Sequence, residues 1–232
     1  MSIAANIEKV EERIHRACAA CGRKREEITL LAVSKFQGLP AIEEAWNAGL
    51  RIFGESRVRE GVEKFSVFRE NHSVEGIHLI GALQRNKAKA AAGFFDCVQS
   101  LDRMELLTEL EKCAHIRNAP LDILLELHTA EDSKSGFPDI DSLCAAAERA
   151  LCCGSLRLKG LMTMAPFTGE QQPIRNSFRL LCKARDILER RFPSGPHCSW
   201  ACLSMGMSGD FEIAVEEGST MLRIGGAIFG EG

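Results

Sequence analysis

The sequence contains no tyrosine among its 232 residues, and aromatic residues make up only 6% of it. A phenol therefore cannot serve as an acid or a base in this chain. No apolar run is long enough to span a bilayer, and residues 1–13 lack the apolar stretch of a secretion signal. A basic excess is also missing: the net charge is -3, which argues against a dedicated nucleic-acid binder. We therefore expect a cytoplasmic protein that binds neither membrane nor nucleic acid.

A metal-binding pattern is missing as well, although ten cysteines are present. Cys18 and Cys21 form one C-x-x-C, but no second C-x-x-C and no closely spaced histidine pair completes a zinc site. Both fall on the apolar stripe of a helix predicted over residues 3–21, where cysteine behaves as a small hydrophobe. We expect free thiols in a reducing compartment and no bound metal.

Strand and helix patterns alternate along the chain, and no linker, repeat or low-complexity segment divides it. Eight strand-helix units preceded by one extra helix predict a single TIM (β/α)8 barrel rather than a doubly wound sheet. A Rossmann fold would also require G-x-G-x-x-G after its first strand, and that motif is missing. The predicted strands cover residues 29–34, 51–54, 77–81, 97–101, 121–128, 158–163, 200–204 and 221–225.

Several helix ends are also recognisable. Pro40 marks the start of a helix that Gly49 closes. Asp102 with Glu105 resembles a capping box, and Ser208 is expected to cap a short helix before strand eight.

The stretch "LLAVSKFQG", residues 30–38, is a buried strand that ends on Lys35. One interpretation is an ordinary strand-end lysine whose ammonium reaches water. The other is an amine beside an apolar floor, poised to condense with an aldehyde. Active sites of TIM barrels lie at the carboxyl ends of the strands, and this position favours the second interpretation.

Two glycine-containing loops follow strands seven and eight, where such barrels often bind phosphate. Either loop alone could be an ordinary turn, but as a pair they favour an anion site, because glycine lets backbone N–H groups approach a phosphate. The residues concerned are Ser204, Gly206, Met207 and Ser208 in the first loop, and Gly225 and Gly226 in the second. Arg223 lies within strand eight. It is interpreted either as an ion-pair partner in the barrel wall or as a contact to a cofactor.

An amine, a phosphate cup and a cation in one barrel mouth are the parts needed to hold pyridoxal 5′-phosphate. From about Leu30 to Gly230 the sequence resembles the YggS/PROSC family of pyridoxal-phosphate homeostasis proteins, in "LLAVSK", "IFGESRV", "HLIGALQRNK", "DSKSGF", "LKGLMTMAP" and "LSMGMSGDFEIAVEEGSTMLRIGGAIFG". The resemblance implies one barrel of the alanine racemase N-terminal-domain type over residues 1–232. It also implies a pyridoxal-phosphate-binding protein of intracellular cofactor homeostasis, with apo-enzymes that require the cofactor as candidate partners. We expect a monomer.

The resemblance also implies roles for individual residues. Lys35 matches the lysine that forms the aldimine, and Arg223 matches the arginine that faces the pyridine nitrogen. Ser204, Gly225 and Gly226 match the phosphate cup, beside which Met207 is also expected. Lys134, in "DSKSGF", is expected after strand five, where we favour a solvated loop lysine over a site residue.

Four positions depart from the family pattern. Ser56 and Arg57 stand where the family usually has Asn-Tyr, so Ser56 is expected near the cofactor with a shorter side chain. Gln37 replaces a frequent second lysine, and Gly226 replaces a threonine, so it can offer a phosphate only its N–H. These changes bear on cofactor affinity.

Catalysis is not expected. Amino-acid racemases of the related fold use a lysine and a tyrosine as opposed acid and base, and this chain has no tyrosine. An arginine opposite the ring nitrogen disfavours its protonation and weakens the ring as an electron sink. His78 or a cysteine could in principle replace the tyrosine. One alternative is therefore a pyridoxal-phosphate-dependent amino-acid racemase. Another is a Schiff-base aldolase acting on a phosphosugar, because that class also places a lysine and phosphate loops in a barrel mouth.

Overall fold

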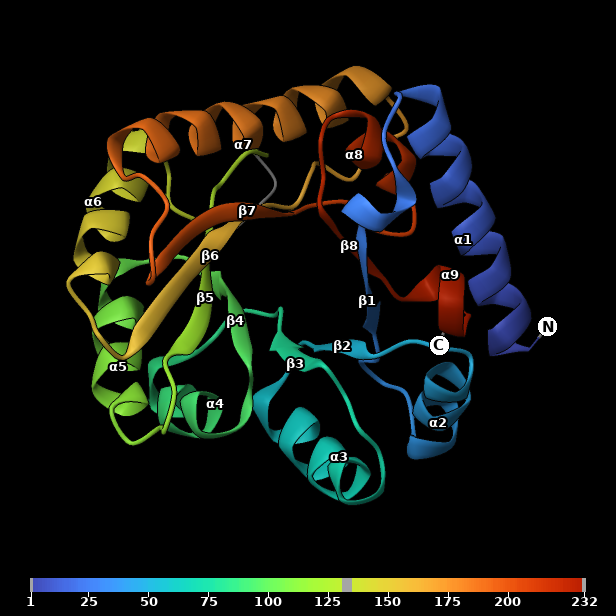
Figure 1. Cartoon of the computed structure of the whole chain (residues 1–232), viewed down its shortest axis with the longest axis horizontal. Helices are drawn as coiled ribbons and strands as arrows, with labels where there is room; N and C mark the ends of the chain where they lie inside the picture. The colour runs from blue at the N-terminus through green and yellow to red at the C-terminus, as the bar shows by residue number, and fades with distance from the viewer. Residues whose placement is uncertain (1, 131–134, 231–232) are drawn as a thin grey trace.

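A computed structural model describes residues 2–130 and 135–230, which form a closed barrel of eight parallel strands in sequential order (Figure 1). The fold is the predicted one, and every strand end lies within two residues of its predicted position. The strands are β1 (Thr29–Val33), β2 (Ile52–Glu55), β3 (Gly76–Leu79), β4 (Cys97–Leu101), β5 (Leu121–Glu126), β6 (Leu156–Met162), β7 (Cys198–Ser204) and β8 (Met221–Ile224).

Helices cover the outside of this barrel, as Figure 1 shows. They are α1 (Ile3–Ala20), α2 (Leu39–Asn47), α3 (Val58–Asn71), α4 (Ala88–Phe94), α5 (Met104–Ala114), α6 (Ile140–Leu151), α7 (Gln171–Arg191), α8 (Phe211–Glu216) and α9 (Gly226–Phe229), with short 3-10 turns η1 (Arg25–Glu27) and η2 (Arg85–Lys87). Among the described residues, no helix combines the length and the apolar character that crossing a bilayer requires.

Alternation along the strands separates two packed layers. Residues such as Ala32 and Phe53 face outward into the large core between barrel and helices, whereas Leu31 and Val33 face inward with Met221. The strand ends at Val33, and the residue two positions later lines a cavity at the barrel mouth. That residue is Lys35.

The extra helix α1 holds the two short helices that follow the glycine loops. It packs against both α8 and α9. Arg13 pairs with Glu212 of α8, with 2.7 Å between Nε and Oε1. Asn6 donates from Nδ2 to the carbonyl of Ile228 in α9 at 2.9 Å. The α1 segment therefore fixes the elements that border both loops.

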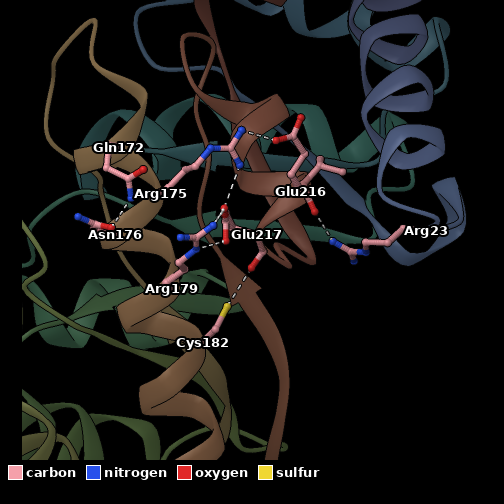
Figure 2. A network of polar contacts seen from close by, with 9 residues as sticks. Arg23, Gln172, Arg175, Asn176, Arg179, Cys182, Glu216 and Glu217 are labelled. Carbon is pink, nitrogen blue, oxygen red and sulfur yellow. Dashed lines mark hydrogen bonds and ion pairs between the residues drawn. The ribbon is translucent and has the colours of Figure 1, made fainter.

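A second group of contacts anchors the carboxyl end of α8, as Figure 2 shows. Arg175 and Arg179 of α7 both donate to the carboxylate of Glu217 at 2.8–2.9 Å. Cys182 donates from Sγ to the Glu217 carbonyl at 3.1 Å, and Arg23 donates to the carbonyl of Val215 at 2.9 Å. Guanidinium groups at a helix carboxyl end bind its unpaired carbonyls and nearby carboxylates. These contacts fix the carboxyl end of α8 against α7 and Arg23.

Three local predictions were wrong. Arg103, not Asp102, is the N-cap residue of α5; Asp102 instead accepts a hydrogen bond from Arg103 at 2.5 Å. Asp210, not Ser208, occupies the N-cap position of α8. Cys21 lies beyond the end of α1 and is exposed, whereas Cys18 is buried on the apolar stripe as predicted.

Candidate functional site

A cavity of about 500 Å³ opens at the carboxyl ends of the strands. This volume is within the ~300–1,000 Å³ range of sites for small ligands and cofactors. Of the residues predicted from the sequence, Lys35, Ser56, Met207, Arg223, Gly225 and Gly226 all line it. Lys134 lies outside the described residues.

Lys35 reaches this cavity from a tight turn at the end of β1. The N–H of Gln37 donates to the carbonyl of Ser34 at 3.1 Å, which closes the turn. Phe36, at its third position, has a φ of 66°, a conformation that bulky residues rarely adopt. Its ring centroid lies 5.9 Å from the Lys35 Nζ and 5.6 Å from the Arg57 guanidinium carbon. From this turn Lys35 lines the cavity.

A buried ion pair fixes the backbone immediately before Lys35. Lys64 of α3 donates from Nζ to the Glu55 carboxylate at 2.7 Å and to the Ser34 carbonyl at 2.8 Å. The Ser34 hydroxyl donates to the same Glu55 oxygen at 2.6 Å. Glu55 is fully buried, and its second carboxylate oxygen has no partner among the described residues. Residue pattern alone did not predict this cluster, because it joins three separate elements.

The two glycine loops meet on one side of the cavity. The described residues offer no hydrogen-bond partner to the N–H groups of Ser208, Gly209, Gly225 and Gly226, all of which line the cavity. The Ser208 hydroxyl joins the loops, because it accepts from the N–H of Ala227 at 3.2 Å. Unpaired N–H groups that converge on a cavity suit an anionic group such as a phosphate.

Asp210 stabilises the first of these loops from below. Its carboxylate accepts from the Met207 N–H at 2.6 Å, so that N–H is not free to bind an anion. Burial raises the pKa of Asp210 above its ordinary value, against the lowering effect of this hydrogen bond. Gly206 has a φ of 97°, and a Cβ there would lie 2.6 Å from that of Ala214. Glycine is therefore required where the chain turns from β7 toward α8.

Arg223 forms the floor of the cavity and is almost fully buried. It donates from Nη1 to the Ser204 hydroxyl and from Nη2 to the Thr163 carbonyl, each at 2.8 Å. Burial lowers the pKa of Arg223, and the nearby carboxylates of Glu126 and Asp210 oppose this effect. Arg223 is thus buried, and its guanidinium bonds go to a hydroxyl and a carbonyl rather than to a carboxylate of the described residues.

Ser204, which was predicted to belong to the anion cup, does not line the cavity. It is fully buried beneath Arg223, and its hydroxyl donates to Gln99 Oε1 at 2.6 Å. It lies inside the barrel, whereas Ser208, four residues later, reaches the cavity. The predicted end of β7 at Ser204 is confirmed, but the sequence offers serine at both positions and does not say which of them reaches the cavity.

Glu126 is a cavity residue that the sequence reasoning missed. It ends β5 and faces inward, two residues after the inward-facing Leu124. Its Oε1 accepts from the Ser135 hydroxyl at 2.6 Å, and burial raises its pKa. A carboxylate near the carboxyl end of the predicted strand 121–128 was the available signal. Within the described residues, no cluster of His, Cys, Asp and Glu side chains is arranged to hold a metal ion.

The comparisons with known proteins agree with this arrangement. Residues 2–232 match the family model of the alanine racemase N-terminal domain. The chain is 39% identical over 233 residues to a pyridoxal phosphate homeostasis protein of Vibrio cholerae, covering 99% of this chain and 96% of that protein. The structure of PipY from Synechococcus elongatus with pyridoxal phosphate bound is 30% identical, with a TM-score of 0.80 over 94% of this chain and all of that one. An alanine racemase of Clostridium difficile, 12% identical, shares the fold with a TM-score of 0.79 over 57% of its own chain.

Proposed function

Because this chain belongs to the family of pyridoxal phosphate homeostasis proteins, we propose that it binds pyridoxal 5′-phosphate at the barrel mouth. One observation carries the proposal: an accessible lysine amine, a group of unpaired backbone N–H groups and a buried guanidinium line the same cavity. When bound, the cofactor supplies an aldehyde to which a lysine amine can attach.

Each group has a distinct task in this proposal. Lys35 holds the ligand covalently through its amine, and the N–H groups of Gly225 and Gly226 hold the phosphate together with the Ser208 loop. Arg223 would meet the ring from the floor as a hydrogen-bond donor, because a guanidinium has no acceptor. Ser56 and Met207 also line the cavity that would hold the ring.

The same cavity supports a carrier rather than a catalyst. No histidine or cysteine is among the described residues that line it, and the chain has no tyrosine. His78, the side chain that could replace a tyrosine, lies lower in the barrel, where burial lowers its pKa to about 4. A residue with that pKa is a poor general acid near neutral pH. We therefore propose a cytoplasmic monomer that holds pyridoxal phosphate for apo-enzymes that need it.

Borohydride reduction followed by peptide mapping tests the proposal. The purified protein should show a visible absorbance band, and the reduced cofactor should lie on the peptide that contains Lys35. The variant Lys35→Ala should lose the label, whereas Lys87→Ala, which changes an exposed lysine that does not line the cavity, should retain it. Label on Lys64 or Lys87 would contradict the assignment.

Proton exchange separates the carrier from the racemase. Exchange of the α-proton of L-alanine in deuterated water, followed by NMR, should stay near background while the cofactor is bound. Fast exchange by the wild-type protein would favour the racemase instead.

A further inference from the structure

Four polar side chains from four strands cross the barrel interior below the cavity. Arg223 Nη1 lies 2.8 Å from Ser204 Oγ, which lies 2.6 Å from Gln99 Oε1. Gln99 Nε2 lies 2.7 Å from His78 Nδ1. Gln99 and Ser204 are fully buried. Buried polar groups without partners are destabilising, so a continuous chain of this kind needs each donor matched to an acceptor.

The chemistry of the groups fixes the direction of every bond in this chain. A guanidinium can only donate, so Ser204 accepts from Arg223 and uses its single proton toward Gln99. The carbonyl oxygen of Gln99 must therefore face Ser204, and its amide nitrogen must face His78. A reversed amide would place two donors on Ser204 and leave the hydroxyl proton without an acceptor.

His78 ends the chain as an acceptor. Burial lowers its pKa to about 4, so the ring is neutral near pH 7. Nδ1 is then free to accept from Gln99, and the ring proton must be on Nε2. The second proton of the Gln99 amide points toward Met221, whose Sδ lies 3.2 Å from Nε2.

We propose that Ser204, Gln99 and His78 are positioning residues that hold the Arg223 guanidinium at the cavity floor. This inference rests on the proposed function, since Arg223 is the group that faces the cofactor ring. In all three hydrogen bonds the donor lies on the cavity side and the acceptor on the His78 side. Ser204, Gln99 and His78 therefore direct no proton toward Arg223 at the cavity floor. The chain thereby keeps Arg223 a fixed donor and keeps a bound ring unprotonated from below.

Two near-isosteric substitutions test the chain. Gln99→Met removes the hydrogen bonds to Ser204 and to His78. Gln99→Glu keeps an acceptor for Ser204 but removes the donor to His78. Leu124→Met, a volume-conserving change at a buried inward-facing position, is the control. The measurements are the Kd of pyridoxal phosphate, the absorption spectrum of the bound cofactor, and the tautomer of His78 from long-range ¹H–¹⁵N NMR on protein without added cofactor.

We expect the wild-type protein to carry the His78 proton on Nε2. Gln99→Glu should bring a proton to Nδ1, because a carboxylate there can only accept. Gln99→Met should weaken cofactor binding by up to about tenfold, the largest ratio that loss of one neutral hydrogen bond typically produces. It should also shift the cofactor band, whereas Leu124→Met should change neither quantity.

Three results would overturn the inference. A wild-type His78 protonated on Nδ1 reverses the chain, whether or not any cofactor binds. Tight binding by Gln99→Met with an unchanged spectrum removes the positioning role while the proposed function stands. Failure of the wild-type protein to bind pyridoxal phosphate overturns the proposed function and the positioning role together.

Discussion

The Lys64–Glu55 ion pair next to the Lys35 turn tests how burial changes the contribution of an ion pair to the free energy of unfolding. Lys64→Met keeps the length and apolar character of the side-chain stem but removes the ammonium. Glu55 is fully buried, and the Lys64 side chain is only 12% exposed. The substitution leaves an unpaired carboxylate in the protein interior, which typically destabilises by roughly 3–5 kcal/mol. That is a large share of the roughly 5–15 kcal/mol that separates folded from unfolded domains.

Urea unfolding monitored by far-ultraviolet circular dichroism measures this loss. The double variant Lys64→Met with Glu55→Gln should recover most of it, because neither charge remains to be desolvated. A deficit on the order of 1 kcal/mol should persist, since Lys64 also donates to the Ser34 carbonyl.

Arg59→Met is the matched control on the same helix. Arg59 pairs with Glu63 at 2.7 Å, the same distance as in the buried pair, but both side chains are well exposed. Exposed pairs contribute little, so no measurable change in stability is expected. Equal losses in Lys64→Met and Arg59→Met, or a double variant as unstable as Lys64→Met alone, would refute the reasoning.

Two further predictions concern the loop after β7 and the barrel interior. Gly206→Ala should destabilise the protein by about 2 kcal/mol or more, because φ is 97° and the new Cβ would collide with Ala214; Gly209→Ala, with no atom within 4 Å, should not, and thermal unfolding compares the two. His78 has a folded pKa of about 4 against 6.5 when unfolded, so the unfolded chain binds more protons as the pH falls through this window. The wild-type protein should therefore lose up to about 3 kcal/mol between pH 6.5 and 4 that His78→Gln does not lose, and parallel stability profiles for the two proteins would contradict this.

The barrel was predictable because its physical causes are local. Strands of a parallel barrel are buried on both faces, so they read as short continuous apolar runs whose order along the chain is also their order in space. Helix caps were less predictable, because neighbouring polar residues compete for one position. Asp102 had an adjacent arginine to pair with, and Asp210, two residues after Ser208, took the N-cap position of α8.

The site was predictable only where position along the strand sufficed. Lys35, Arg223 and the glycines follow from strand ends, and they line one cavity. Ser204, Gln99 and Glu55 act through partners on other strands or helices, and no spacing in the sequence encodes those contacts. Their roles depend on how far each strand is shifted relative to its neighbour.

The register between β1 and β8 shows why that shift matters. Arg223 pairs with Leu31, and in a parallel sheet registered neighbours point to the same face, so Arg223 faces inward with Leu31. Lys35 lies four residues beyond Leu31, in the turn that follows β1, and lines the same cavity as Arg223. The Arg223 guanidinium and the Lys35 amine therefore reach one cavity from β8 and from the end of its neighbour β1. A shift of β8 by one residue would turn Arg223 toward the helices and remove the cation from the floor. The site thus depends on the pairing of Met221–Ile224 with β1 as much as on the identity of its residues.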